Sequence, residues 1–430
     1  MFCINNNKVK IAFTRVIISL FFLICFVATG FSQQPIAQGD SVLLNKFYTS
    51  YHEPLFWLSS AKNIKRATEW LNMIVSEDHP RFVTDKAEIS QIRSILRVKK
   101  LKDNILKEKT DRQITGLVLN FIKYMKQGNA SFNYDEVSIP GDSASISQLI
   151  FSGHKSSVSS IVSRLECKDH DYLILKKYLR DSIPDKNSLK YKTVLLAMNY
   201  RKFISINRNP EYILTNIPAT EAEYFKDGLL TVKMRTVVGK KLKPTPTIAS
   251  YITSIVTFPS WNVPHEIAVK ELLPKIQRDD NYLEQNDMEV VDAKGNEIDD
   301  SELNWKNYTE RNFPYFFRQS SGSDNSLGVL KFNLQNPFSI FLHSTSMQSS
   351  FAKDYRFLSH GCVRLEKPFE LATDMLRGNI DLDELRIGKK DTESKTIKLP
   401  GKIPVFIIYS PATVVGNKVI FLKDIYGLVK

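Results

Sequence analysis

The chain has 430 residues, 43% hydrophobic and 24% charged, so it is long enough to bury the cores of two or three domains. A formal net charge of +13 at pH 7 favours an anionic partner, unless it is no more than a solvated basic surface. Two of the four cysteines, Cys3 and Cys25, lie near the N-terminus. Only Cys167 and Cys362 remain, which excludes a disulfide-dense scaffold.

Residues 1–32 have the pattern of a secretory signal. Basic residues up to Arg15 precede an apolar run from Val16 to Val27, and small residues follow at Gly30 and Ser32. The run is shorter than the roughly 20 residues of a membrane span. We therefore expect an exported, periplasmic protein, which contacts the membrane only if this segment stays uncleaved. Nucleic acid is not an expected partner of an exported chain without a nucleic-acid-binding motif.

Residues 33–205 are predicted to be helical. Apolar side chains recur at helical spacing from Ile64 to Ile74, and again between Ile114 and Met125. Thr110 is a candidate N-cap of the second of these helices and Gly128 its end. A third helix is expected over about 190–203. These apolar stripes predict a helical scaffold domain.

Strand patterns begin near residue 211 and continue through the predicted domain 206–410. The segments 221–225 and 229–238 flank Lys226-Asp227-Gly228, which predicts a hairpin. Further strands are expected over 247–258 and 405–409. A short helix over 265–273, ended by Pro274, interrupts them. Residues 411–430 are expected to form a C-terminal strand or tail.

The hexapeptide Ser359-His360-Gly361-Cys362-Val363-Arg364, with His343 upstream, has the composition of a Cys/His acyl-transfer site. A thiolate forms near neutral pH when a cation or an imidazole stands beside the thiol. Glycine lets the backbone turn sharply and aim N–H groups at a reacting carbonyl. The residues alone leave two other interpretations open: a buried structural cysteine, and a zinc site, whose usual ligand spacing is absent.

This hexapeptide resembles the signature of the L,D-transpeptidases, the YkuD-type enzymes that cross-link peptidoglycan, and specifically their large periplasmic subgroup. Other segments resemble the same family in the same order: Val237-Val238-Gly239-Lys240 with Thr245-Pro246-Thr247, residues 258–264 (FPSWNVP), residues 325–332 (NSLGVLKF) and residues 336–343 (NPFSIFLH). The resemblance implies an α+β multidomain fold, with a helical N-terminal scaffold domain and a mostly-β catalytic domain. It also implies a lid subdomain within about 259–355, where the long polar stretch 279–323 lies.

The resemblance further implies roles for individual residues. Cys362 is the expected nucleophile and His343 the expected base, with the Ser344 carbonyl orienting the imidazole. The remaining candidates are supporting residues of the nucleophile loop and, as a weaker assignment, aromatic residues of the cleft: Ser359, His360, Gly361 and Arg364; Trp261 and Tyr355. His360 competes with His343 as the base, but the residue before Gly361 is expected to face away from the sulfur. Cys167 is expected to be structural.

The implied activity is the formation of 3→3 cross-links between peptidoglycan stem peptides through a Cys362 thioester, and hence a part in cell-wall biogenesis and cell shape. Two alternatives remain: an L,D-carboxypeptidase that trims tetrapeptide stems, and a non-catalytic wall-binding scaffold protein. Other cell-wall synthesis proteins are possible partners. No metal-ligand pattern or nucleotide motif is present in the sequence, so we expect neither metal nor cofactor. The resemblance also implies that carbapenems acylate Cys362.

Overall fold

The computed structural model describes residues 41–76, 86–98, 101–137, 149–150, 156–378, 382–387 and 393–430. The predicted secretory signal, residues 1–32, lies outside these ranges. Within them, no helix combines the length and the apolar character needed to cross a membrane.

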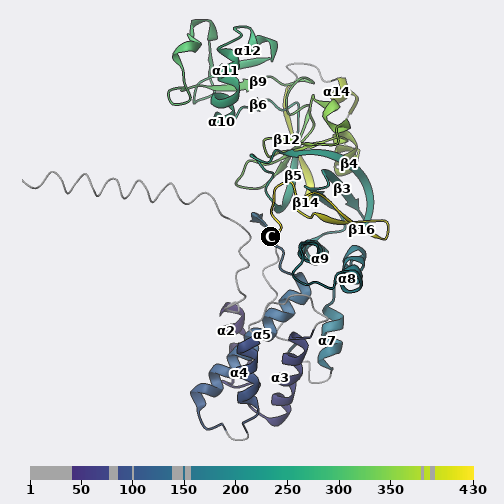
Figure 1. Ribbon diagram of the computed structural model, residues 1–430. Coiled ribbons are helices and arrows are strands. Elements are labelled where there is room, and N and C mark those ends of the chain that lie inside the picture. Colours follow the sequence, from purple (N-terminus) through teal and green to yellow (C-terminus); the bar gives the residue numbers. More distant parts are fainter. Residues whose placement is uncertain are drawn as a thin grey trace, which may run out of the picture.

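A bundle of helices forms the N-terminal part, as the apolar spacing predicts (Figure 1). Its helices are α2 (Ser41–Tyr51), α3 (Ala61–Ile74), α4 (Lys86–Leu96), α5 (Asn104–Gln127) and α7 (Val158–Leu165). Trp57, Trp70 and Phe121 are almost completely buried in its core. The expected N-cap Thr110 was wrong, because α5 begins six residues earlier. Asp103 caps it by accepting a hydrogen bond from the Leu106 N–H, and the helix ends at Gly128 as predicted.

Two further helices, α8 (His170–Ser182) and α9 (Leu189–Asn207), belong to other hydrophobic clusters. Tyr200 and Phe203 of α9 pack on Phe406 and Ile408 of the sheet described next. The predicted helical domain therefore divides into a bundle and two further helices, of which α9 packs on the sheet and α8 packs on α9 and near Ala412.

The main sheet is ten-stranded and closes on itself. Its strand order is β1-β5-β10-β11-β13-β4-β3-β2-β14; β12 pairs with β4, and an additional β14–β5 pairing closes the ring. The strands are β1 (Tyr134–Asp135), β2 (Tyr212–Asn216), β3 (Glu221–Lys226), β4 (Leu229–Gly239), β5 (Ile248–Thr257), β10 (Leu330–Leu334), β11 (Leu342–His343), β12 (Phe357–Ser359), β13 (Val363–Leu365) and β14 (Lys395–Ile408). The predicted β3–β4 hairpin is present, with Asp227 at φ 53° and Gly228 at φ 77° in its turn.

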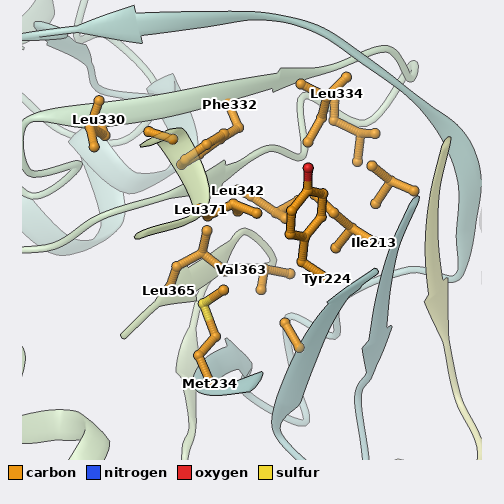
Figure 2. Packing of buried hydrophobic residues seen from close by; sticks show 14 of the residues in the cluster. Ile213, Tyr224, Met234, Leu330, Phe332, Leu334, Leu342, Val363, Leu365 and Leu371 are labelled. Atoms are coloured by element: carbon orange, nitrogen blue, oxygen red, sulfur yellow. The ribbon is translucent and has the colours of Figure 1, made fainter. Parts of the chain in front are cut away.

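The core enclosed by this sheet lies directly beneath the candidate site. Figure 2 shows Phe332, Leu342 and Val363 among its buried side chains. These three residues are register partners across β10, β11 and β13, and each is fully buried. Since side chains alternate along a strand, the residues next to them must point to the opposite face.

Shorter elements complete the sheet domain. They are η5 (Gln348–Ala352), α13 (Pro368–Leu376), α14 (Leu382–Ile387), β15 (Ala412–Val415) and β16 (Lys418–Phe421). Leu371 and Met375 of α13 are buried in the core within the sheet. β15 and β16 form an antiparallel hairpin, and the predicted C-terminal tail continues beyond it to residue 430.

A lid subdomain, Trp261 to Gln319, is inserted between β5 and β10 and lies at the end of the sheet domain remote from the helical bundle (Figure 1). Its elements are β6 (Trp261–Asn262), α10 (His265–Ile267), η2 (Ala268–Leu272), α11 (Leu273–Ile276), α12 (Tyr282–Gln285), β7 (Met288–Val291), β8 (Glu297–Ile298), η3 (Asp300–Glu302), η4 (Trp305–Asn307) and β9 (Phe316–Gln319). It has a four-stranded sheet and a hydrophobic core of its own. β10 and β11, which also fall within the expected range of about 259–355, are strands of the main sheet.

One local expectation for this subdomain was wrong. Pro274 does not end the helix, because a π-turn over Ala268–Leu272 shifts the hydrogen-bond register. The proline then falls in the first turn of α11, where its missing N–H leaves no acceptor unsatisfied. The polar stretch 279–323, expected to belong to the lid, contributes Leu283 and Val290 to the core of this subdomain.

Phe332→Ala should lower the free energy of unfolding of the sheet domain by about 3–5 kcal/mol, because it removes a fully buried ring and leaves a cavity. Denaturant unfolding followed by circular dichroism measures this loss. Leu242→Ala is the matched control: its side chain is 88% exposed, and the change should stay within about 0.5 kcal/mol. Equal effects of the two substitutions would contradict the described core.

Candidate active site

The parallel pairing of β11 with β13 places Cys362 and His343 on one face of the sheet. Leu342 pairs with Val363 and His343 with Arg364, and the Val363 N–H donates to the Phe341 carbonyl at 3.1 Å. Leu342 and Val363 point into the core, so His343, Arg364 and the flanking Cys362 point to the opposite face. The fold thus brings the predicted nucleophile and the predicted base to the same face of two adjacent strands.

The loop that carries Cys362 is fixed by a tight turn. Gly361 has φ 127°, a conformation that L-residues rarely adopt, and a Cβ there would approach Ile340 Cδ1 to 2.9 Å. Ser359 Oγ donates to the Cys362 carbonyl at 2.6 Å and accepts from the Gly361 N–H at 3.1 Å. The Gly361 N–H is therefore occupied, whereas the structure records no partner for the Cys362 N–H among the described residues. The Cys362 N–H is the better candidate for an oxyanion donor.

The nucleophile and the base are both neutral in this arrangement. Burial raises the pKa of the Cys362 thiol to about 11, although the Phe341 backbone, Lys331 and Arg364 act in the opposite direction. Burial, and next the charge of Arg364, lower the pKa of His343 to about 3. The thiol donates to the Ser339 carbonyl at 3.7 Å rather than to the imidazole. A thiolate–imidazolium pair is thus strongly disfavoured at rest, so proton transfer must accompany attack.

Ser344 stands where an orienting group for His343 is expected. The backbone of Ser344, and next that of Leu327, favours the protonated imidazole and raises the His343 pKa. His343 Nδ1 is nevertheless buried without a hydrogen bond of ordinary geometry. The Ser344 side chain is engaged separately, accepting from the Leu330 N–H at 2.9 Å. The Ser344 backbone is therefore near the ring, although no hydrogen bond of ordinary geometry joins it to Nδ1.

His360 is directed toward the lid instead of the sulfur. Its Nε2 lies 2.7 Å from Glu271 Oε1 and 3.2 Å from Lys240 Nζ. Glu271 belongs to the π-turn of the lid subdomain. Burial raises the pKa of Glu271, but His360 and Lys240 outweigh it and hold that pKa below its usual value. His360 therefore joins the nucleophile loop to the lid.

The remaining predicted residues occupy different surroundings. Trp261 is half-buried against the lid core, and Tyr355 is 52% exposed with its ring against Phe357. Arg364 is on the face of the nucleophile, where its Nη1 contacts Met347 Sδ at 4.0 Å. Cys167 is distant from Cys362 in sequence and is buried, and its thiol donates to Ser205 Oγ at 3.3 Å. In the part of the chain that the structure describes, no group of three His, Cys, Asp or Glu could hold a metal ion.

Two residues that brace the nucleophile loop escaped the sequence analysis. Thr245 Oγ1 donates to the Gly361 carbonyl at 2.7 Å and accepts from the Gly239 N–H at 2.8 Å. Tyr426, in the C-terminal tail, donates to the Gly239 carbonyl at 2.5 Å and accepts from the Thr245 N–H at 3.2 Å. The threonine of the Thr-Pro-Thr segment was visible as a motif, but no local pattern marks Tyr426. The predicted tail is therefore a support of the site.

Comparison with known proteins finds sequence matches to one family. Residues 210–397 match the family model YkuD, described as the L,D-transpeptidase catalytic domain. Over 237 residues the chain is 34% identical to a protein of Haemophilus influenzae named putative L,D-transpeptidase, covering 55% of this chain and 48% of that protein. The chain thus spans about half the length of this curated relative.

Solved structures show a looser likeness. The catalytic domain of the Enterococcus faecium L,D-transpeptidase acylated by ertapenem is 13% identical, covering 46% of this chain and 98% of that chain at a TM-score of 0.24. An L,D-transpeptidase from Mycobacterium smegmatis is 13% identical, covering 46% and 58% at a TM-score of 0.20. At these TM-scores the assignment depends on the sequence matches, which confirm the resemblance seen in the motifs.

Tyr426→Phe should lower the free energy of unfolding by about 1–3 kcal/mol, because the Gly239 carbonyl and the Thr245 N–H each lose a partner. It should also slow alkylation of Cys362 or make it heterogeneous as the loop loosens. Denaturant unfolding and mass spectrometry of iodoacetamide-treated protein measure the two effects. Tyr355→Phe, at an exposed tyrosine, is the control. A Tyr426→Phe protein with unchanged stability and reactivity would show that the tail is not a support.

Proposed function

We propose that this protein, in which residues 210–397 form an L,D-transpeptidase catalytic domain of the YkuD family, forms 3→3 cross-links between peptidoglycan stem peptides. The observation that carries the proposal is the shared face of Cys362 and His343 on adjacent parallel strands. The excess of basic residues is consistent with an anionic wall polymer as substrate.

Acylation begins when the Cys362 sulfur attacks the carbonyl of the L-centre of the third stem residue. The thiol proton passes to His343 and then to the amine of the terminal D-residue, which leaves as the C–N bond breaks. The carbonyl oxygen, negative in the tetrahedral intermediate, is stabilised by the free Cys362 N–H and by the positive charges nearby. The product is a thioester.

Deacylation repeats these steps with a different partner. A side-chain amine of a neighbouring stem attacks the thioester carbonyl, gives a proton to His343, and forms the cross-link amide while the thiol is restored. Water in place of the amine would give a trimmed tripeptide. The link from Glu271 to His360 holds the lid subdomain against the nucleophile loop, which supports a role of the lid in excluding water.

We further propose that the protein acts in the periplasm, where these stems are exposed. This follows from the secretory pattern of residues 1–32 and from the substrate class. Membrane attachment would require that the segment remain uncleaved, and other cell-wall synthesis proteins are candidate partners at the same surface.

Cys362→Ala should abolish product formation, because no other described thiol lies on the site face. Purified protein is incubated with sacculi rich in tetrapeptide stems, and muropeptides are measured by mass spectrometry. Cys167→Ala is the matched control and should retain most activity, since the Cys167 thiol is hydrogen-bonded to Ser205 and not part of the site. Cross-linked dimers support the proposal, tripeptides alone would indicate a carboxypeptidase, and no change with the wild-type protein would indicate a scaffold. Turnover by Cys362→Ala would overturn the assigned nucleophile.

A carbapenem should acylate Cys362 once per molecule. The β-lactam offers a strained carbonyl to a sulfur beside an oxyanion donor. Intact-protein mass spectrometry should show one adduct, and peptide mapping should place it between Phe357 and Arg364. The Cys362→Ala protein serves as the control; an adduct that persists there would place the chemistry on another residue.

Glu271→Ala should shift products from cross-link toward tripeptide by up to about fivefold, because a half-exposed ion pair contributes about 0.2–1 kcal/mol to lid closure. This substitution is a cleaner test than deletion of about 279–302, which would remove core residues of the lid. Glu310→Ala is the control, since its partner Lys270, at 3.6 Å, lies in the same subdomain. An unchanged product ratio in Glu271→Ala would exclude a role for this link.

A further inference from the structure

Two cations flank the candidate base and the nucleophile. Lys331 on β10 is the register partner of His343 on one side, and Arg364 on β13 is its partner on the other. Partners in register point to the same face, so Lys331, His343 and Arg364 form a row across three strands. Cys362 lies two residues before Arg364, on the same face. Lys331 has entered the proposed chemistry only as a positive charge near the nucleophile.

Neither cation is paired with an acid in the described part of the chain. Lys331 Nζ lies over the Phe341 ring, 4.3 Å from its centroid. Arg364 contacts Met347 only through sulfur, and its Nε is buried without any hydrogen-bond partner. Burial lowers the pKa of both groups, and Cys362 acts in the opposite direction on each.

Some other basic residues of this domain do have such partners. Arg235 forms an ion pair with Glu366, and Lys243 forms one with Glu266. Half-buried positive charge without a counter-ion is costly, and the cost is relieved when an anion binds. The row beside Cys362 is therefore arranged to receive an anionic group of a ligand.

We propose that Lys331 and Arg364 bind the terminal carboxylate of the donor stem, the carboxylate of the residue that leaves. This inference rests on the proposed function and deepens it by naming the two residues that would recognise the end of the stem. The expected bracing role of Arg364 is replaced by a substrate contact, since no hydrogen bond to the nucleophile loop uses its guanidinium.

The geometry of a terminal residue favours this carboxylate. Only a nitrogen and a Cα separate the scissile carbonyl carbon from the carboxylate carbon, so the two carbons lie no more than about 4 Å apart. When the sulfur is about 3–3.5 Å from the scissile carbon, the carboxylate is within reach of cations that neighbour Cys362. The guanidinium can hold both carboxylate oxygens, and the ammonium adds a point charge.

The first experiment does not depend on turnover of any stem. Iodoacetate and iodoacetamide alkylate the same sulfur, but only iodoacetate carries a carboxylate. In a Cys167→Ala background of the full chain, the rates are measured on the Cys362 peptide by mass spectrometry, so that Cys3 and Cys25 do not contribute. The ratio of the iodoacetate rate to the iodoacetamide rate should fall several-fold on Lys331→Gln and on Arg364→Gln. Arg364→Lys should restore part of the ratio, and Lys353→Gln, at an exposed lysine, should leave it unchanged. An equal ratio in all these proteins would overturn the carboxylate subsite.

The second experiment identifies the carboxylate. Synthetic tetrapeptide stems ending in a D-residue are compared as the free acid, as the terminal carboxamide, and with only the side-chain carboxylate of the third residue amidated. The wild-type protein should prefer the free acid over the terminal carboxamide by about tenfold to a hundredfold in kcat/KM of acylation. Arg364→Gln should lose most of this preference, chiefly by slowing the free acid.

The outcomes distinguish a failure of the carboxylate assignment from a failure of the proposed function. Equal use of the free acid and the terminal carboxamide, or sensitivity to the side-chain amide alone, would overturn the terminal assignment. Failure to process any stem would contradict the proposed function, while the alkylation ratio would still report on the carboxylate subsite.

Discussion

The parallel pairing of β11 with β13 is the constraint on which the rest of the site depends. It fixes Leu342 and Val363 in the core, and alternation then requires His343, Cys362 and Arg364 to share the outer face. A slip of one residue would turn the base and the nucleophile to opposite sides. The buried row beneath them makes such a slip costly, because it would expose apolar side chains. The packing of the core therefore fixes the relative positions of the base and the nucleophile.

The electrostatics of this site favour neutral Cys362 and neutral His343 before substrate binds. Burial disfavours both the thiolate of Cys362 and the imidazolium of His343, and the neighbouring cations stabilise only the first. An anion bound between Lys331 and Arg364 would raise the pKa of the Cys362 thiol and that of the His343 imidazole together. The difference between these two pKa values would therefore stay nearly unchanged. Substrate binding therefore contributes by placing the scissile carbonyl, while the Cys362 N–H and the lid supply the surroundings that attack requires.

Much of the fold and the central pair could be predicted from the sequence, because apolar spacing, the β3–β4 turn and the motif around Cys362 are local signals. The failures have physical causes. Thr110 resembles a cap, but the helix begins earlier, at Asn104, and is capped by Asp103; Pro274 is accommodated by a π-turn that leaves no periodic trace. Tyr426 and Glu271 act on the loop from segments far away in sequence, which only the folded chain reveals. Lys331 lies in one of the motifs, yet its position beside His343 depends on the register of three strands.

The most direct test of the account is detection of the thioester itself. Wild-type protein and His343→Gln are mixed with a tetrapeptide stem, quenched in acid at short times, and measured by intact-protein and peptide mass spectrometry. The account predicts an adduct of the stem minus its terminal residue on the Cys362 peptide, formed far more slowly in His343→Gln. An adduct on another residue, one that retains the terminal residue, or equal rates in the two proteins would contradict it.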